Sequence, residues 1–237
     1  MKRYIFFCIV ALFLAIGLTS CVTDYPTPSL SSTTSSNIVS ASPTHLAYYE
    51  NISKTSKPTG IDVTMTIDNI LVGEPLVSTE SYRLMEQNGK TYICLDYSYE
   101  TMEKASVENG VVIGGGKTTT TGTLYSTEEI DNVGQFSASG LSFDQDYIQR
   151  YTIEDGTVSH TKVCTMDILP ARAEAYFGMT FSQEVIFVSV EVTVDTANER
   201  LLSVNMTIKT KANEKVAITT LEYQYSYTTY TFEVPAE

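Results

Sequence analysis

The C-terminal third of the chain alternates apolar and polar residues with a period of two. The even positions of 186–194 are Ile or Val and the odd positions are mostly polar; Leu202, Val204, Met206 and Ile208 repeat the pattern. Successive side chains of a strand point to opposite faces, so both runs predict strands with one buried face. A third run covers 215–234, and polar turns at 196–199 and 211–214 separate the runs. The sequence predicts a three-stranded antiparallel meander.

The phase of the alternation changes inside the last run. Leu221, Tyr223, Tyr225 and Tyr227 are odd, whereas Tyr230, Phe232 and Val234 are even. One inward face can be kept across such a change by a β-bulge or a bend. We expect that irregularity near Thr228 and Thr229.

Earlier segments add further strands and two helices. Residues 60–68 alternate, a hairpin is expected around Asn88-Gly89 within 81–99, and another around Asp155-Gly156 within 145–166. A short helix is expected over 44–54, with Leu46, Tyr49 and Ile52 on one side, and a second helix over 168–178. The sequence therefore predicts a β-rich α+β protein.

The N-terminus has the features of an export signal. Lys2 and Arg3 precede an apolar run at 4–16, and Leu18-Thr19-Ser20-Cys21 resembles a bacterial lipobox. We expect residues 1–20 to be a lipoprotein signal peptide and Cys21 to carry the lipid, although an ordinary secretory signal is the alternative. Residues 21–43 read as a Ser/Thr/Pro-rich tether and 44–237 as a single β-rich domain. The expected location is the cell envelope, lipid-anchored to a membrane on its extracytoplasmic side.

Charge and composition argue against several kinds of function. The net charge of −13 is unsuited to binding nucleic acid, and two His with scattered Cys give no recognisable metal site, cofactor site or catalytic set. A catalytic pairing of His160 with Cys164 is discounted, because the two residues lie four positions apart on one expected strand, about 13 Å from each other. Cys94 and Cys164 could form a disulfide in an exported protein or remain buried free thiols, and the sequence leaves both open.

The order of these elements resembles a known group of bacterial lipoproteins. The sequence is similar to the lipoprotein-carrier fold of LolA and LolB and the LppX/LprG-like lipoproteins. The shared order is a lipobox, a tether, a short helix, paired hairpins, a lone helix, and a meander that ends in an aromatic strand and an EVP tail. The resemblance implies a curved antiparallel sheet, an unclosed half-barrel, with one to three helices on its concave face. It also implies that an acyl chain or lipid is held between sheet and helix. The chain departs from the pattern by fewer helices and a Gly- and Thr-rich insert near 105–127.

The aromatic residues of the last strand and second helix supply a candidate ligand site. Tyr223 and Tyr225 could line an apolar slot beneath Tyr176 and Phe177, or all four could be ordinary core. We expect a membrane-anchored lipoprotein, attached through its N-terminal lipid, that binds an apolar ligand or envelope lipid without catalysis and without a cofactor. The alternative is a structural or interaction lipoprotein with a filled core that acts through its surface; no particular protein partner is indicated.

Overall fold

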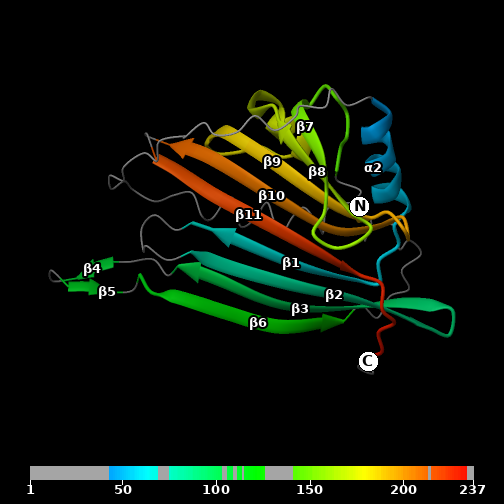
Figure 1. Cartoon of the computed structure of the whole chain (residues 1–237). Helices are drawn as coiled ribbons and strands as arrows, with labels where there is room; N and C mark the ends of the chain where they lie inside the picture. The colour runs from blue at the N-terminus through cyan, green and yellow to red at the C-terminus, as the bar shows by residue number, and fades with distance from the viewer. Residues whose placement is uncertain are drawn as a thin grey trace.

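The structure, a computed structural model, describes residues 43–68, 75–102, 106–108, 111–113, 115–125, 141–212 and 215–233. Its dominant feature is one open antiparallel sheet of nine strands in the order β6-β3-β2-β1-β11-β10-β9-β8-β7. Figure 1 shows β6 at one edge and β7 at the other, so the sheet is curved but not closed. The expected fold class, a β-rich curved sheet with few helices, is confirmed.

The elements follow one another along the chain in an order close to the expected one. They are α2 (Pro43–Thr55), β1 (Gly60–Ile67), β2 (Leu76–Gln87), β3 (Lys90–Met102), β4 (Ser106–Glu108), β5 (Val111–Ile113), β6 (Lys117–Tyr125), β7 (Ile148–Asp155), β8 (Thr161–Ile168), η2 (Pro170–Arg172), α3 (Ala173–Phe177), β9 (Glu184–Asp195), β10 (Arg200–Ala212) and β11 (Lys215–Ser226). Strands β4 and β5 form a separate two-stranded sheet.

The predicted meander is present as β9, β10 and β11. Val190, Val192 and Val194 are each 0% exposed, while Glu191 and Thr193 between them are partly exposed, as the alternation requires. The chain bends at Thr228, where a bulge or bend was expected, but the expected continuation of the strand to 234 is wrong, because β11 ends at Ser226. The following residues leave the sheet as a tail across the ends of β1, β2 and β3 (Figure 1). In this tail the Tyr227 hydroxyl donates to the Leu201 carbonyl at 2.7 Å, and the Arg83 guanidinium lies 5.0 Å from the Tyr230 ring centre.

The first predicted hairpin is confirmed and the second is different in detail. Asn88 and Gly89 have φ values of 53° and 75°, which is the left-handed pair that a two-residue turn needs. Strands β7 and β8 are instead joined by 156–160, and the positive φ, 62°, falls on His160. Gly156 is there for another reason: a Cβ on it would lie 2.1 Å from the Thr161 hydroxyl oxygen.

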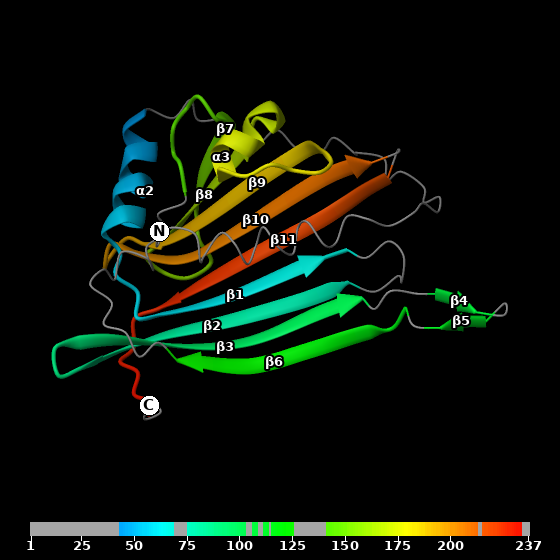
Figure 2. The same ribbon diagram turned by 180° about the vertical axis from the view of Figure 1, so that it is seen from behind.

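The first predicted helix is confirmed, and the second is shorter than expected, because Ile168 ends β8 and the α-helix covers only Ala173–Phe177. Helix α2 buries Leu46, Tyr49 and Ile52, all at most 2% exposed, and packs against β9 and β10. The 3₁₀ turn η2 packs against β9 and continues into α3, which ends at Gly178 with a φ of 64°. We call the sheet face toward which these helices pack the helix face, and the opposite one the outer face. Figure 2 shows both helices over the β7–β10 half of the sheet.

Cys94 and Cys164 are free and buried, so the disulfide alternative is not realised. Val192, the cross-strand partner of Cys164, lies on the helix face. On β3, Leu95 belongs to that same face, so its neighbour Cys94 points to the outer face. The two strands are also far apart in the sheet order, with five others between them. Both thiols therefore serve as small apolar core groups.

Candidate functional site

The expected lipid-attachment residue, Cys21, lies outside the described residues, as do the expected signal peptide and the expected tether up to residue 42. The first described element is α2, which begins at Pro43. No helix within the described ranges is both long and apolar enough to cross a membrane.

Tyr176 and Phe177 lie on α3 and pack into the aromatic end of the larger core cluster. Tyr176 is 5% exposed and meets Tyr147 edge-on, with ring centres 5.9 Å apart. Phe177 meets Tyr176 at 5.0 Å and Phe181 at 6.0 Å, both near perpendicular. These contacts are typical of core packing.

Tyr223 and Tyr225 lie on β11, two strands from the β9 strand that η2 and α3 adjoin. They are partly buried and contact both core clusters: the larger one under the helices and a smaller one built on Ile61, Val63, Tyr82 and Leu84. Their two rings and those of Tyr176 and Phe177 form no common stack among the ring contacts of the described residues. Tyr176 belongs to the larger core cluster, and Phe177, Tyr223 and Tyr225 all pack against it, so the four expected residues border one core.

A group of hydroxyls surrounds the Cys164 thiol beneath the helices. Burial raises the pKa of Cys164 to about 12, so the thiol stays protonated. Burial also raises the pKa values of Tyr49, Tyr151 and Tyr176, and the sulfur contributes to each shift. The Tyr49 hydroxyl is buried without a hydrogen-bond partner among the described residues, and the Tyr176 hydroxyl lies by the Ser142 backbone without a well-formed bond. A protonated, fully buried thiol of this kind is a poor nucleophile.

The other half of the helix face is built differently. Strands β11, β1, β2 and β3 present the smaller cluster there, with Ile93 and Leu95 packed against it. In Figure 2 neither α2 nor α3 lies over these strands. We call this region, made of the helix-face side chains of the four strands, the uncovered strip. No described helix lies over it, yet its core side chains Ile61, Val63, Tyr82 and Leu84 are buried, at 2–7% exposure.

Glu80 of β2 lies in the middle of the uncovered strip. The register pairs it with Val63 of β1 on one side and with Tyr97 of β3 on the other. Its two carboxylate oxygens each accept a hydrogen bond of 2.6 Å, one from the Tyr82 hydroxyl and one from the Tyr99 hydroxyl. The pKa of Tyr223 rises to about 12, mainly because of burial and secondly because of the Glu80 carboxylate. The pKa of Tyr82 rises for the same two causes, in the same order. Glu80 is therefore a charge held among phenol groups that stay protonated.

Tyr97 and Tyr99 form a stacked pair beside Glu80. The Tyr97 and Tyr99 rings stack with centres 4.9 Å apart and planes 20° from parallel. Tyr97 extends over Gly122 of the edge strand, where a Cβ would lie 2.4 Å from the Tyr97 hydroxyl oxygen. Only glycine leaves room for that ring. We call Glu80, Tyr82, Tyr97, Tyr99 and Tyr223 the Glu80 cluster.

Apart from Tyr223, the residues of the Glu80 cluster were not among those predicted from the sequence, although a signal for them exists. A two-residue turn at Asn88-Gly89 pairs Gln87 with Lys90 and fixes every later pair in the hairpin. Counting back from that turn places Glu80 beside Tyr97 on one face. The turn residues alone predict the hairpin, and the pair of Glu80 with Tyr97 is found only when the register is extended from that turn.

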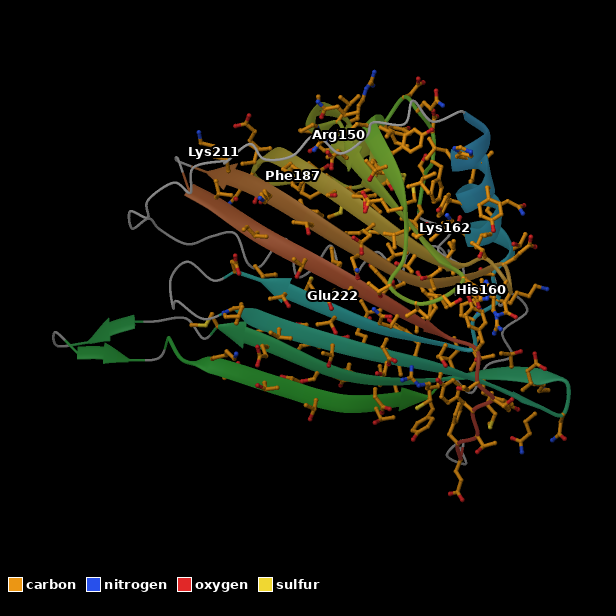
Figure 3. The ribbon with its side chains drawn as sticks, in the orientation of Figure 1. Arg150, His160, Lys162, Phe187, Lys211 and Glu222 are labelled. Atoms are coloured by element: carbon orange, nitrogen blue, oxygen red, sulfur yellow. The ribbon has the colours of Figure 1, made fainter. Side chains whose placement is uncertain are left out.

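The remaining candidate groups are separate from one another. His160 is exposed in the turn before β8, at the right-hand end of the sheet in Figure 3, whereas Cys164 is fully buried on β8. No group of three or more His, Cys, Asp or Glu in the described part of the chain is arranged to hold a metal ion.

Comparison with known proteins adds no family assignment. No protein-family model matches the chain, and no curated protein matches it significantly. What the fold itself defines is a class: an α+β protein with an open, curved antiparallel sheet and two short helices covering one half of one face.

Proposed function

We propose that this protein is a membrane-anchored bacterial lipoprotein that binds an apolar ligand or an envelope lipid without catalysis. Cys21 is the proposed lipid-attachment site on the extracytoplasmic side of the membrane. The uncovered strip is the proposed binding surface, with Tyr223 and Tyr225 at its border, while Tyr176 and Phe177 act only as core beside it.

The observation that carries this proposal is the asymmetry of the helix face. The β7–β10 half is filled by α2, η2 and α3, and its valines are fully buried. The β11–β3 half carries a second apolar core cluster with no described helix over it. Its residues Ile61, Val63, Tyr82 and Leu84 are only 2–7% exposed, so a ligand gains affinity by burying its own apolar area against them and not by covering an open surface.

Binding is tested with the mature protein and a fluorescent fatty-acid probe, alongside native mass spectrometry of freshly purified protein. Leu95→Ser shortens a helix-face side chain of the strip and should weaken probe binding several-fold, since about 1–2 kcal/mol of apolar contact is lost. Asp96→Asn is the matched control, because Asp96 is the next residue along β3 and is exposed on the outer face. Absence of saturable binding by wild-type protein, together with no retained lipid, would contradict the proposal.

A structural or interaction lipoprotein is the second candidate, and one observation favours it. Beneath the helices the core is filled, with Cys164, Met166 and Val190 each 0% exposed. If the probe does not bind, the function belongs to the surface of the domain, and the same uncovered strip becomes the surface to test for a protein partner.

A further inference from the structure

The two edges of the nine-stranded sheet differ in how they are protected against pairing with another chain. Among the described residues β6 and β7 are the outermost strands (Figures 1 and 2). Natural proteins usually block such edges with charged side chains, proline or a β-bulge. Strand β7 follows this rule, because it carries Arg150, Glu154 and Asp155 and its register with β8 is interrupted between Ile148 and Arg150. The β7 edge is therefore poorly suited to a further strand.

Strand β6 has none of these protections. Residues 118–125 contain no charged side chain and no proline, and the register with β3 is unbroken along the whole strand. Most of its residues are exposed, including Leu124 at 57% and Tyr125 at 38%. Its one charged residue, Lys117, lies 2.8 Å from the Glu100 carboxylate of β3, so that charge is already compensated within the sheet. The β6 edge is therefore open to extension by another strand.

The sequence of β6 is suited to pairing with a second copy of itself. When two copies run antiparallel about a two-fold axis at Thr121, all nine residues pair, because Thr121 is the middle of the strand. Thr121 then faces its own copy and Thr119 faces Thr123. Such cross-strand threonine pairs stabilise neighbouring strands. On the other face the exposed Leu124 is covered by Thr118 of the second copy.

Charge also favours a second copy at this edge over any other part of the same surface. The chain carries a net charge of −13, so two copies repel one another in general. Strand β6 contains no Asp or Glu. The antiparallel arrangement places Lys117 of one copy opposite the Tyr125 ring of the other, so no like charges meet across the two strands.

We propose that two copies of this chain associate through β6, in an antiparallel, two-fold symmetric pairing centred on Thr121, so that one continuous sheet runs through both copies. The interface consists of backbone hydrogen bonds between the two edges and of the threonine pairs. Thr121 pairs with Ser98 of β3 and so lies on the outer face, whereas Leu124 pairs with Leu95 and lies on the helix face. This inference goes beyond the proposed lipid binding and does not depend on it, since no ligand takes part in the pairing.

Cysteine cross-linking in cells that express the full chain tests the pairing and its register. Thr121→Cys should give a covalent dimer on a non-reducing gel after mild oxidation, because opposed Cα atoms lie about 4.5–5.5 Å apart, within reach of a disulfide. Thr119→Cys should give little, because four strand residues, about 13 Å, separate it from its own copy. Co-expression of Thr119→Cys with Thr123→Cys should restore the cross-link. The wild-type chain gives the background from its own cysteines.

Sedimentation velocity on the mature protein measures the association without added cysteines. Wild-type protein should show a concentration-dependent equilibrium between monomer and dimer. Thr121→Lys should weaken the dimer about tenfold or more, because two like charges then face one another at the axis. Glu154 is the matched control position, since it is exposed on the opposite edge strand. Glu154→Lys should leave the dimer unchanged and Glu154→Cys should give no cross-link, while a thermal melt of each variant verifies folding.

The outcomes separate this inference from the proposed function. If Thr121→Cys gives no covalent dimer and wild-type protein stays monomeric at every concentration, the pairing is wrong, whatever the fatty-acid probe shows. If Thr119→Cys or Glu154→Cys cross-links as well as Thr121→Cys, the contacts are random collisions and the pairing is again wrong. If Thr121→Lys leaves a wild-type dimer intact, the copies associate through another surface and the assignment to β6 fails.

Discussion

Replacing Val192 with Asp tests the register of the sheet and the reasoning about its buried face. Val192 is 0% exposed and lies between Cys164 on β8 and Val204 on β10, which are also buried. Loss of the valine contacts costs about 1.5–3 kcal/mol. A carboxyl in that place can avoid burying its charge only by staying protonated, so its folded pKa rises above the unfolded value of about 3.9.

The pH dependence follows from the sign of that shift. The folded state then binds more protons than the unfolded state, so the free energy of unfolding falls as pH rises, by about 1.4 kcal/mol per pH unit between pH ~3.9 and the folded pKa. An upward shift of about three units adds roughly 4 kcal/mol of destabilisation by pH 7. Together with the lost contacts, the total is comparable to the whole stability of a typical domain, about 5–15 kcal/mol.

Urea unfolding followed by circular dichroism at pH 7 and pH 4.5 measures this effect in three variants. Val192→Asp should lose much more stability at pH 7 than at pH 4.5, and Val192→Asn, which has a similar shape and no titration, should show the same loss at both. Thr193→Asp, on the adjacent partly exposed position, should lose less than about 1 kcal/mol. Equal losses at 192 and 193 would refute the register, because a one-residue slip exchanges the two faces.

Three further predictions concern the anchor, α3 and the thiols. Cys21→Ser should move the protein from the membrane fraction to the soluble fraction, as followed by immunoblot after a high-salt wash; retention would contradict the lipid anchor. Phe177→Ala should cost about 2 kcal/mol in urea unfolding, less than for a fully buried ring, and leave probe affinity unchanged, because α3 adjoins β9 and not the uncovered strip. Cys164 should resist thiol reagents in the native protein at pH 8 and react after unfolding. Because its folded pKa of about 12 exceeds the unfolded value of about 8.5, stability should fall by about 2 kcal/mol from pH 8.5 to pH 10.

Local patterns in the sequence predicted most of the fold. The alternation around Val192 gave β9 with its buried face, the Leu46, Tyr49 and Ile52 spacing gave α2, and Asn88-Gly89 gave a hairpin with both residues at positive φ. Each of these depends on neighbours only a few residues away, and so a single sequence is enough.

The errors and omissions came from contacts between distant residues. The alternation continued past Ser226, yet those residues pack with Arg83 and Leu201 and form no strand. The position of α3 could not be read from its own sequence, because a short helix with apolar residues on one side fits any part of an apolar sheet face. The strand order places β10 between β11 and the β9 strand on which η2 packs, which the local pattern of the last strand does not show.

Position 80 shows how a polar residue on an apolar sheet face can be hidden within an otherwise regular pattern. The helix-face positions of β2 are Leu76, Ser78, Glu80, Tyr82 and Leu84, a weak alternation in which an acid looks like an ordinary solvated residue. Only the pairing with β1 and β3 shows that this acid faces the same way as Val63 and Tyr97. An apolar side chain there would extend the strip and avoid the desolvation of a carboxylate. The polar residue at this position is thus disfavoured by packing alone, and such sites are where binding requirements are expected to outweigh stability.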